Sequence, residues 1–275
     1  MRAQTIFRWV CLSALLLPLV VLLLLLAQLL FQGSGRLGLD FVTSFPSRKA
    51  ELAGIYPALV GSVMLMAIAT AVAIPLGIGA AIYLEEYASH NLFARMVELN
   101  VSNLAGIPSV IYGLLGLELF VRLMGLKQSL LAGALTLALL MLPIIITACR
   151  EALKTVPRSY QEACYALGST KFVAIIKVII PLAMPGILTG SILAISRAIG
   201  ETAPLIVLGA ATYIAFVPDG LDSEFTALPI QIFNWVSRPQ KAFWNDAAAG
   251  IIVLLLTLLI LNLLAIFLRN RFERR

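Results

Sequence analysis

The chain has 275 residues, of which 61% are hydrophobic and 12% are charged, and its mean hydropathy is +0.99. Soluble domains carry roughly 25% charged residues and at most about half apolar ones, so this composition excludes a soluble globular protein and indicates an integral membrane protein. The formal net charge of +6 does not indicate nucleic-acid binding, because the basic residues lie beside candidate membrane spans.

A membrane span needs about 20 mostly apolar residues. Runs of this kind cover six stretches, residues 9–31, 59–84, 104–124, 130–149, 185–210 and 247–268. The first follows Arg2 and Arg8, but it is longer than the ~7–15 apolar residues of a secretory signal core. We therefore expect a retained first helix, and a single all-α membrane domain over residues 1–275.

Lys and Arg accumulate in the cytoplasmic flanks of membrane spans. With the N-terminus inside, the inner flanks hold more of these residues than the outer flanks do. We therefore expect both termini in the cytoplasm. The basic tail "RNRFERR" also suits contact with anionic membrane lipid, and no nucleic-acid partner is expected.

Enzymatic and metal-binding motifs are missing from the sequence. Cys11, Cys149 and Cys164 show no metal or redox spacing, and His90 is the only histidine. No G-x-x-x-x-G-K-[ST] stretch is present, so the chain cannot bind ATP in the Walker manner. We expect no catalytic residue, no metal and no cofactor bound by this chain.

The longest inner connection, residues 150–182, predicts a helical hairpin. A first helix is expected from Ser159 to Leu167, with Gly168 as its C-terminal cap. Ser169 or Thr170 can cap a second helix that ends at Pro181. An apolar face of the first helix is formed by Tyr160, Ala163, Cys164 and Leu167. Such a helix could lie on lipid, on its own bundle or in a groove of a partner.

This connection resembles the EAA loop of permease subunits of ATP-binding-cassette (ABC) importers, which reads E-A-A, three residues, G, nine residues, I-x-L-P. Glu162, Ala163 and Cys164 take the place of the triplet, and Gly168 follows at the family spacing. Cys164 replaces an Ala but packs as a small apolar residue. The resemblance implies the six-span type I ABC importer permease fold, with these four residues in a coupling helix that docks on a separate ATPase.

Other stretches are similar to the A-type permeases of phosphate importers: "AGIYPALVGS", "GIPSVIYGLLGL", "SRAIGETAPL" and "FTALPIQIFNWVSRPQ". This resemblance implies a permease for inorganic phosphate in the inner (plasma) membrane of a bacterial cell. It also implies the partners, which are a C-type permease homologue, two ATPase subunits that hold ATP and Mg, and an extracytoplasmic phosphate-binding protein.

Arg197 and Glu201 lie four residues apart within the fifth predicted span, where charge is costly. Pro204 and Gly200 are expected to kink the helix beside this pair. A structural salt bridge between two permeases is one interpretation. Because buried ion pairs gain little stability over apolar packing and Arg suits phosphate geometry, we favour a place on the substrate pathway.

Three further patterns concern packing and charge. Glu118 and Arg122 have the same spacing near an outer membrane surface and predict a rim salt bridge, with a role in substrate entry as the alternative. Small residues predict close helix contacts at two places. One is the face formed by Ser109, Tyr112, Gly113 and Gly116, for which a pore-lining role is the alternative, and the other is Gly186 with Gly190.

Two other functions remain open from the sequence. The same architecture could carry sulfate, molybdate or a phosphonate, and a non-conducting membrane sensor or scaffold belongs to a different class. A proton-coupled carrier that uses Glu201 is disfavoured, because it has no need of the long inner connection.

Overall fold

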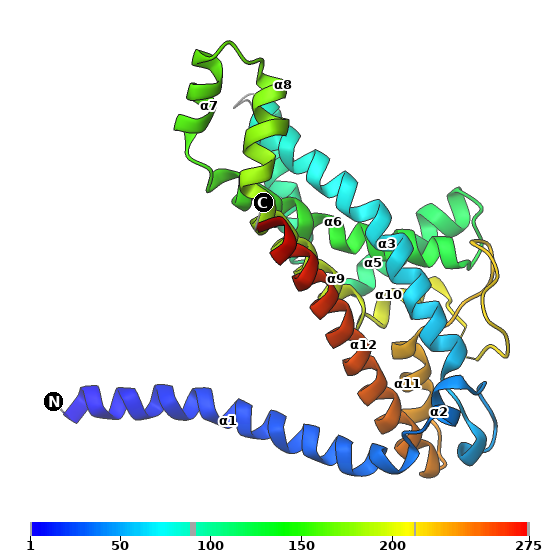
Figure 1. Ribbon diagram of the computed structural model, residues 1–275. Coiled ribbons are helices and arrows are strands. Elements are labelled where there is room, and N and C mark those ends of the chain that lie inside the picture. Colours follow the sequence, from blue (N-terminus) through cyan, green and yellow to red (C-terminus); the bar gives the residue numbers. More distant parts are fainter. Residues whose placement is uncertain (1, 89–91, 212, 274–275) are drawn as a thin grey trace.

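The computed structural model describes residues 2–88, 92–211 and 213–273. Long helices run side by side in an elongated bundle, and the first helix extends away from it (Figure 1). The α-helices are α1 (Arg2–Gly33), α2 (Leu39–Thr43), α3 (Tyr56–Ile82), α4 (Leu92–Ala105), α5 (Ser109–Gly116), α6 (Leu130–Lys154), α7 (Arg158–Ala166), α8 (Lys171–Ala174), α9 (Ile180–Ala198), α10 (Ala203–Leu208), α11 (Leu228–Val236) and α12 (Ala242–Glu273).

Shorter helical turns extend or connect these helices. Turns of 3₁₀ type cover Ser34–Arg36 and Ala50–Leu52. Turns of π type continue α3 and α5 and join α8 to α9, at Tyr83–Tyr87, Leu117–Leu123 and Ile175–Ile179. Turns of this type are rare and frequently lie at functional sites, and the first and last of them lie beside the hairpin of α7 and α8.

Five helices in the described part of the chain are long and apolar enough to cross a membrane, or six if α4 and α5 count as one bent span. The third predicted span, 104–124, is therefore not one straight helix. The helical segments Arg95–Ala105 and Ser109–Leu123 are bent by 109° relative to each other, and the break lies near the start of the predicted span. Pro108 lies at the break, directly before α5, and a proline disfavours helical backbone in the residue before it.

The fifth predicted span, 185–210, is displaced along the chain. The apolar helix covers Lys171–Ala198 instead. It begins earlier because the π turn Ile175–Ile179 carries the helix onward into α9. It ends earlier because the backbone leaves the helix after Ala198, before Gly200 and Pro204, and a new short helix starts at Ala203.

Helix α6 lies at the centre of the bundle and packs against α3 and α9. Glycines permit the close approach. A Cβ atom on Gly190 would lie 2.3 Å from Ala148 Cβ, and one on Gly186 would lie 2.6 Å from Ala152 Cβ. The close contact predicted at Gly186 and Gly190 is thus confirmed, and it forms inside this chain between α9 and α6.

A second, smaller apolar core lies at the end of the bundle opposite α7, where α2 and α11 are seen (Figure 1). Its largest members are Phe41, Ile55, Trp235 and Phe243, which are all buried. The rings of Phe41 and Trp235 are 5.7 Å apart between centroids. This core packs the connection between α1 and α3 against α11 and the start of α12, and so forms a cap on the bundle.

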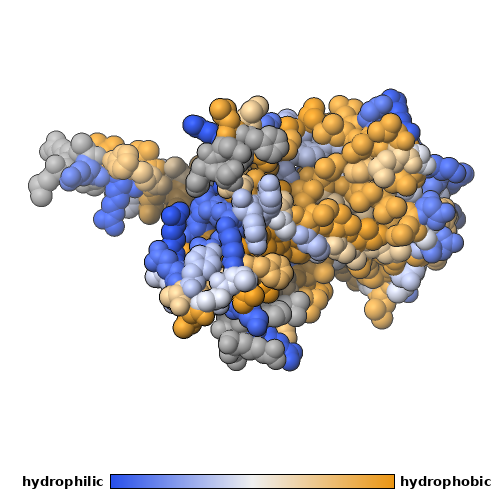
Figure 2. Space-filling view, turned by 90° about the horizontal axis from the view of Figure 1, so that it is seen from above, coloured by the Kyte–Doolittle hydropathy of each residue, from blue (hydrophilic) through white to orange (hydrophobic). Residues whose placement is uncertain are grey.

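The surface divides into apolar and polar regions, as a membrane requires. None of the most apolar stretch of α1 is buried within this chain. Figure 2 looks from the α7 end of the molecule and shows hydrophilic residues gathered beside a broad hydrophobic area. Lipid or a partner helix must cover the apolar flanks, because exposure of this much apolar surface to water is unfavourable.

Candidate functional site

Gly168 ends α7 as the sequence predicts. Its φ angle is +80°, a conformation that favours glycine. The Gly168 N–H donates to the carbonyl of Tyr165 (2.9 Å), and the Ser169 N–H donates to that of Cys164 (3.0 Å). This pair of bonds is the Schellman motif, which satisfies the last carbonyls of a helix.

The second helix of the hairpin begins at Lys171. The Thr170 hydroxyl accepts a hydrogen bond from the Val173 N–H (3.4 Å), so Thr170 rather than Ser169 is the cap. The predicted end of this helix at Pro181 is wrong. Pro181 lies in the first turn of α9, directly after the π turn Ile175–Ile179, where the regular α-helical hydrogen-bond pattern is already interrupted. The hairpin and the fifth span therefore form one continuous helical rod, residues 171–198.

Helix α7 projects from one end of the molecule (Figure 1). Glu162 and Ala163 are exposed and Cys164 is half-buried. On the predicted apolar face, Tyr160 is 48% and Leu167 is 86% exposed. This face is therefore not covered by the rest of the described chain, which argues against its packing on the chain's own bundle.

Arg197 and Glu201 form the predicted ion pair, but they do not share a helix. The Arg197 Nε lies 3.6 Å from the Glu201 Oε1. Arg197 is in the last turn of α9, whereas Glu201 lies in the break between α9 and α10. The expected kink is in fact a complete interruption, because Gly200 leaves the helical path and Pro204 starts α10.

Exposure distinguishes the two members of this pair. The side chain of Arg197 is 49% exposed and that of Glu201 is 18% exposed. The separation of 3.6 Å is too long for a good hydrogen bond. Arg197 thus keeps donors that an anion approaching from the open side could use.

The break in α9 lies near the break between α4 and α5. A Cβ atom on Gly113 would lie 2.7 Å from the Pro204 Cα, so α5 and α10 are in close contact. The Tyr112 hydroxyl donates to the Leu104 carbonyl across the bend (2.8 Å). Two interrupted spans therefore meet beside Arg197.

The small residues of α5 pack as predicted. Tyr112, Gly113 and Gly116 are buried, and a Cβ atom on Gly116 would lie 2.1 Å from the Thr136 Oγ1. Ser109, the first residue of this face, is half-buried. This packing favours the close-contact interpretation over a pore-lining role for this face.

The second predicted pair, Glu118 and Arg122, is also formed. The Arg122 Nη1 lies 2.9 Å from the Glu118 Oε2, in the π turn after α5. Both side chains are about two-thirds exposed (66% and 69%). Exposed pairs of this kind contribute little stability.

Sequence reasoning missed two ion-pair clusters, because their members lie far apart in the chain. Arg36 pairs with Asp246 at 2.6 Å at one end of the bundle. At the other end, Arg150 pairs with Glu85 (3.3 Å) and Glu98 (3.1 Å). The adjacent acidic residues Glu85 and Glu86, just after the end of a predicted span, were the sequence feature that could have indicated an ion-pair cluster at this place.

Among the described residues there is no group of three or more His, Cys, Asp or Glu placed to hold a metal ion. Cys11, Cys149 and Cys164 are free thiols. His90 lies outside the described residues.

The fold and the site define a multi-pass membrane subunit with an exposed helical hairpin, which is the class of the permeases. The chain belongs to the family of binding-protein-dependent transport system inner membrane components, which matches residues 73–275. The resemblance seen in the sequence is thereby confirmed.

Named relatives narrow the class further. The chain is 36% identical to the phosphate transport system permease protein PstA 1 of Mycobacterium tuberculosis (strain CDC 1551 / Oshkosh), over 81% of this chain and 72% of the relative. It is 36% identical to the phosphate transport system permease protein PstA of Yersinia pestis, over 82% of this chain and 75% of the relative.

Solved structures confirm the fold. A bacterial ABC transporter involved in the import of alginate is similar with a TM-score of 0.68 and 17% identity, over 98% of both chains. The MetNI methionine ABC transporter is similar with a TM-score of 0.58 and 20% identity, over 78% of this chain and 92% of that one. The type I ABC importer permease fold expected from the sequence is therefore the observed one.

Proposed function

We propose that this chain is the permease subunit of an ATP-driven importer of inorganic phosphate. The observation that carries the proposal is the similarity of most of the chain to permeases named for phosphate transport. The half-exposed Arg197 at the interruption of α9 supports it, because a guanidinium offers paired donors to a phosphate oxyanion.

In this proposal Glu201 keeps Arg197 paired when no anion is present. The two groups are already close, at 3.6 Å. An arriving phosphate can therefore take the place of the Glu201 carboxylate beside Arg197, so that the guanidinium is never left without an anion inside the membrane. Gly200 gives the backbone beside the pair conformational freedom. Pro204 has no N–H to donate to the Gly200 carbonyl, so no helical hydrogen bond joins these two residues across the interruption.

The driving force would come from a separate ATPase at the α7 end, which is then the cytoplasmic side, with both termini on that side. The exposed Tyr160 and Leu167 support docking of α7 in a groove on that ATPase. Glu162, Ala163, Cys164 and Gly168 are the contact and cap residues. The rod 171–198 would carry movement of α7 to Arg197, near its far end.

The remaining partners belong to the same proposal. A second, C-type permease would complete the path, a pair of ATPase subunits would bind ATP and Mg, and an extracytoplasmic phosphate-binding protein would deliver the substrate. One structural neighbour is a bacterial alginate ABC transporter in complex with a periplasmic protein that holds an alginate pentasaccharide, which supports delivery by a binding protein. This chain itself would carry out no chemistry.

The test is phosphate uptake by the reconstituted complex in vesicles that contain ATP. Arg197→Gln should abolish uptake while the complex still assembles, because the change removes the charge and keeps a polar side chain with the same first three carbons. Normal uptake in this variant would overturn the pathway role of Arg197. Arg122→Gln is the matched control, since Arg122 belongs to an exposed pair of the same spacing, and it should leave uptake unchanged.

Competition identifies the substrate in the same assay. Excess unlabelled phosphate should block uptake of labelled phosphate, whereas sulfate, molybdate and a phosphonate should not. If one of those anions competes better than phosphate, the chain is a permease for that anion. If the wild-type complex moves no anion but changes a reporter of phosphate starvation, the sensor function holds instead.

A further inference from the structure

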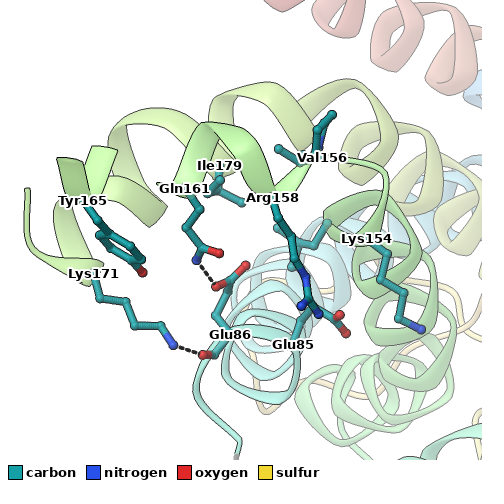
Figure 3. A pocket seen from close by; sticks show the side chains of 11 residues that line it. Glu85, Glu86, Lys154, Val156, Arg158, Gln161, Tyr165, Lys171 and Ile179 are labelled. Carbon is teal, nitrogen blue, oxygen red and sulfur yellow. Dashed lines mark hydrogen bonds between the residues drawn. The ribbon is translucent and has the colours of Figure 1, made fainter. Parts of the chain in front are cut away.

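A cavity of about 420 Å³ lies between the far end of α3 and the α7–α8 hairpin. Figure 3 shows it from close by, with Gln161 and Lys171 of the hairpin pointing toward Glu86 at the end of α3. Because side chains do not fill this space, apolar packing is weak here. Contacts at the rim of the cavity must connect the hairpin to α3.

Glu86 receives two of these contacts. The Gln161 Nε2 donates to the Glu86 Oε2 (2.7 Å), between residues 75 positions apart in the sequence. The Lys171 Nζ donates to the backbone carbonyl of Glu86 and lies 5.0 Å from the centroid of the Tyr87 ring. Both helices of the hairpin, α7 through Gln161 and α8 through Lys171, therefore reach the same π turn, Tyr83–Tyr87, which follows α3.

The neighbouring carboxylate makes its contacts elsewhere. Glu85 pairs with Arg150 of α6, and Arg150 also pairs with Glu98 of α4. The Arg150 side chain is only 13% exposed, so it lies inside the bundle end. The two adjacent carboxylates therefore connect the turn Tyr83–Tyr87 to different parts of the molecule: Glu85 contacts the helix bundle, and Glu86 contacts the hairpin.

This turn has π geometry. The Ala88 N–H donates to the Tyr83 carbonyl, five residues earlier (2.8 Å). The opposite wall of the cavity includes Ile179, at the end of the π turn Ile175–Ile179. Irregular turns of this type recur at functional positions in helices. Here two of them lie beside the cavity that separates the hairpin from the end of α3.

We infer that Glu86 is a positioning residue that couples the hairpin to α3, so that movement of α7 reaches α3 and the bundle as well as the rod 171–198. This inference rests on the proposed function, in which an ATPase moves α7. The contact at Glu86 would transmit movement of α7 to α3 as a second route, in addition to the transmission along the continuous chain of the rod 171–198. Loss of this route uncouples hydrolysis from transport and leaves assembly intact.

The test reverses the polarity of the Gln161–Glu86 hydrogen bond in the complete complex. Gln161→Glu places two carboxylates together, so it should raise the number of ATP molecules hydrolysed per phosphate transported by about fivefold, the scale of a modest coupling free energy. Adding Glu86→Gln restores a donor opposite a carboxylate and should return this ratio to that of the wild type. Glu86→Gln alone keeps an acceptor for Gln161 and should have little effect.

Controls separate this role from a structural one. Glu151→Gln alters an exposed pair on the same end of α6 and should leave the ratio unchanged, and co-purification with the ATPase checks assembly of every variant. If Gln161→Glu does not assemble, Gln161→Ala removes the donor without adding charge and should raise the ratio in the same direction.

Three outcomes decide the inference. A raised ratio in Gln161→Glu that the double variant reverses supports it. A wild-type complex that carries phosphate, with a normal ratio in Gln161→Glu or no rescue in the double variant, overturns the role of Glu86 alone. A wild-type complex that hydrolyses ATP but carries no phosphate contradicts the proposed function, and the role of Glu86 falls with it.

Discussion

The Arg36 Nε lies 2.6 Å from the Asp246 Oδ1, and this ion pair joins the turn after α1 to the second turn of α12. The Asp246 side chain is 1% exposed. Arg36 also donates to the carbonyls of Ala50 (2.6 Å) and Ala53 (2.9 Å). One guanidinium therefore connects three segments of the chain at the end opposite α7.

Removing Arg36 should destabilise the protein strongly. Arg36→Met leaves the Asp246 carboxylate buried without its partner, which costs about 3–5 kcal/mol. The double variant Arg36→Met with Asp246→Leu should recover much of this loss, because no buried charge remains. The measurement is thermal unfolding of the purified chain in detergent, and equal destabilisation of the single and double variants would contradict the argument.

The contact between Gly113 and Pro204 makes a second prediction. Gly113→Ala places a methyl group 2.7 Å from the Pro204 Cα and 3.0 Å from the Val207 Cβ, so α5 and α10 must separate. Overpacking of this kind costs about 1–3 kcal/mol. Unfolding in detergent should show the loss, and uptake should fall because the interruption beside Arg197 shifts.

Gly79→Ala is the control for Gly113→Ala. Gly79 is in α3, and no atom lies within 4 Å of a Cβ atom placed there. Because alanine favours helical backbone over glycine by up to about 1 kcal/mol, this variant should be unchanged or slightly more stable. Equal losses in both variants would mean that the α5–α10 contact is not the cause.

The left-handed conformation of Gly168 makes a third prediction. A Cβ atom at Gly168 has no neighbour within 4 Å, so Gly168→Ala acts on the backbone alone and costs about 1–2 kcal/mol. Residues 158–167 should then exchange their amide hydrogens faster, because α7 loses its cap. Gly168→Asn should have a smaller effect, since Asn tolerates this conformation better than Ala does.

The exposure of Leu167 makes a fourth prediction. Leu167→Glu should leave the stability of the chain unchanged, because this side chain is 86% exposed. If the proposed function holds, it should weaken binding to the ATPase, because a charge would replace an apolar side chain on the proposed docking face. Leu52→Glu is the control, a change at a 65% exposed leucine that lies at the other end of the bundle, and it should leave that binding unchanged. Binding of the ATPase to the detergent-solubilised chain is the measurement.

Local features were predictable because their causes lie within a few residues. A helix that ends at a glycine needs only that glycine and the carbonyls before it, and Gly168 has the expected φ angle and hydrogen bonds. The ion pairs at four-residue spacing, Arg197 with Glu201 and Glu118 with Arg122, were predictable for the same reason.

Hydropathy identified apolar runs but not how the backbone passes through them. The run 185–210 contains a helix end, an irregular turn and a new helix start, and most of its residues are compatible with lipid. Proline was a poor guide to helix ends in and before this run, because the helix continues through Pro181 whereas Pro204 lies at the start of α10. Its effect depends on the hydrogen bonds of the preceding turn, which composition does not contain.

The sequence by itself determined that this is a helical membrane protein, where its apolar helices approximately lie, and that α7 ends at Gly168. Only the tertiary structure decided which distant charges meet, such as Arg36 with Asp246 and Gln161 with Glu86. The physical reason is the distance along the chain over which each interaction acts. Hydrophobicity and backbone preferences act through neighbouring residues, whereas an ion pair or hydrogen bond between helices exists only after packing has brought its two groups within about 3 Å.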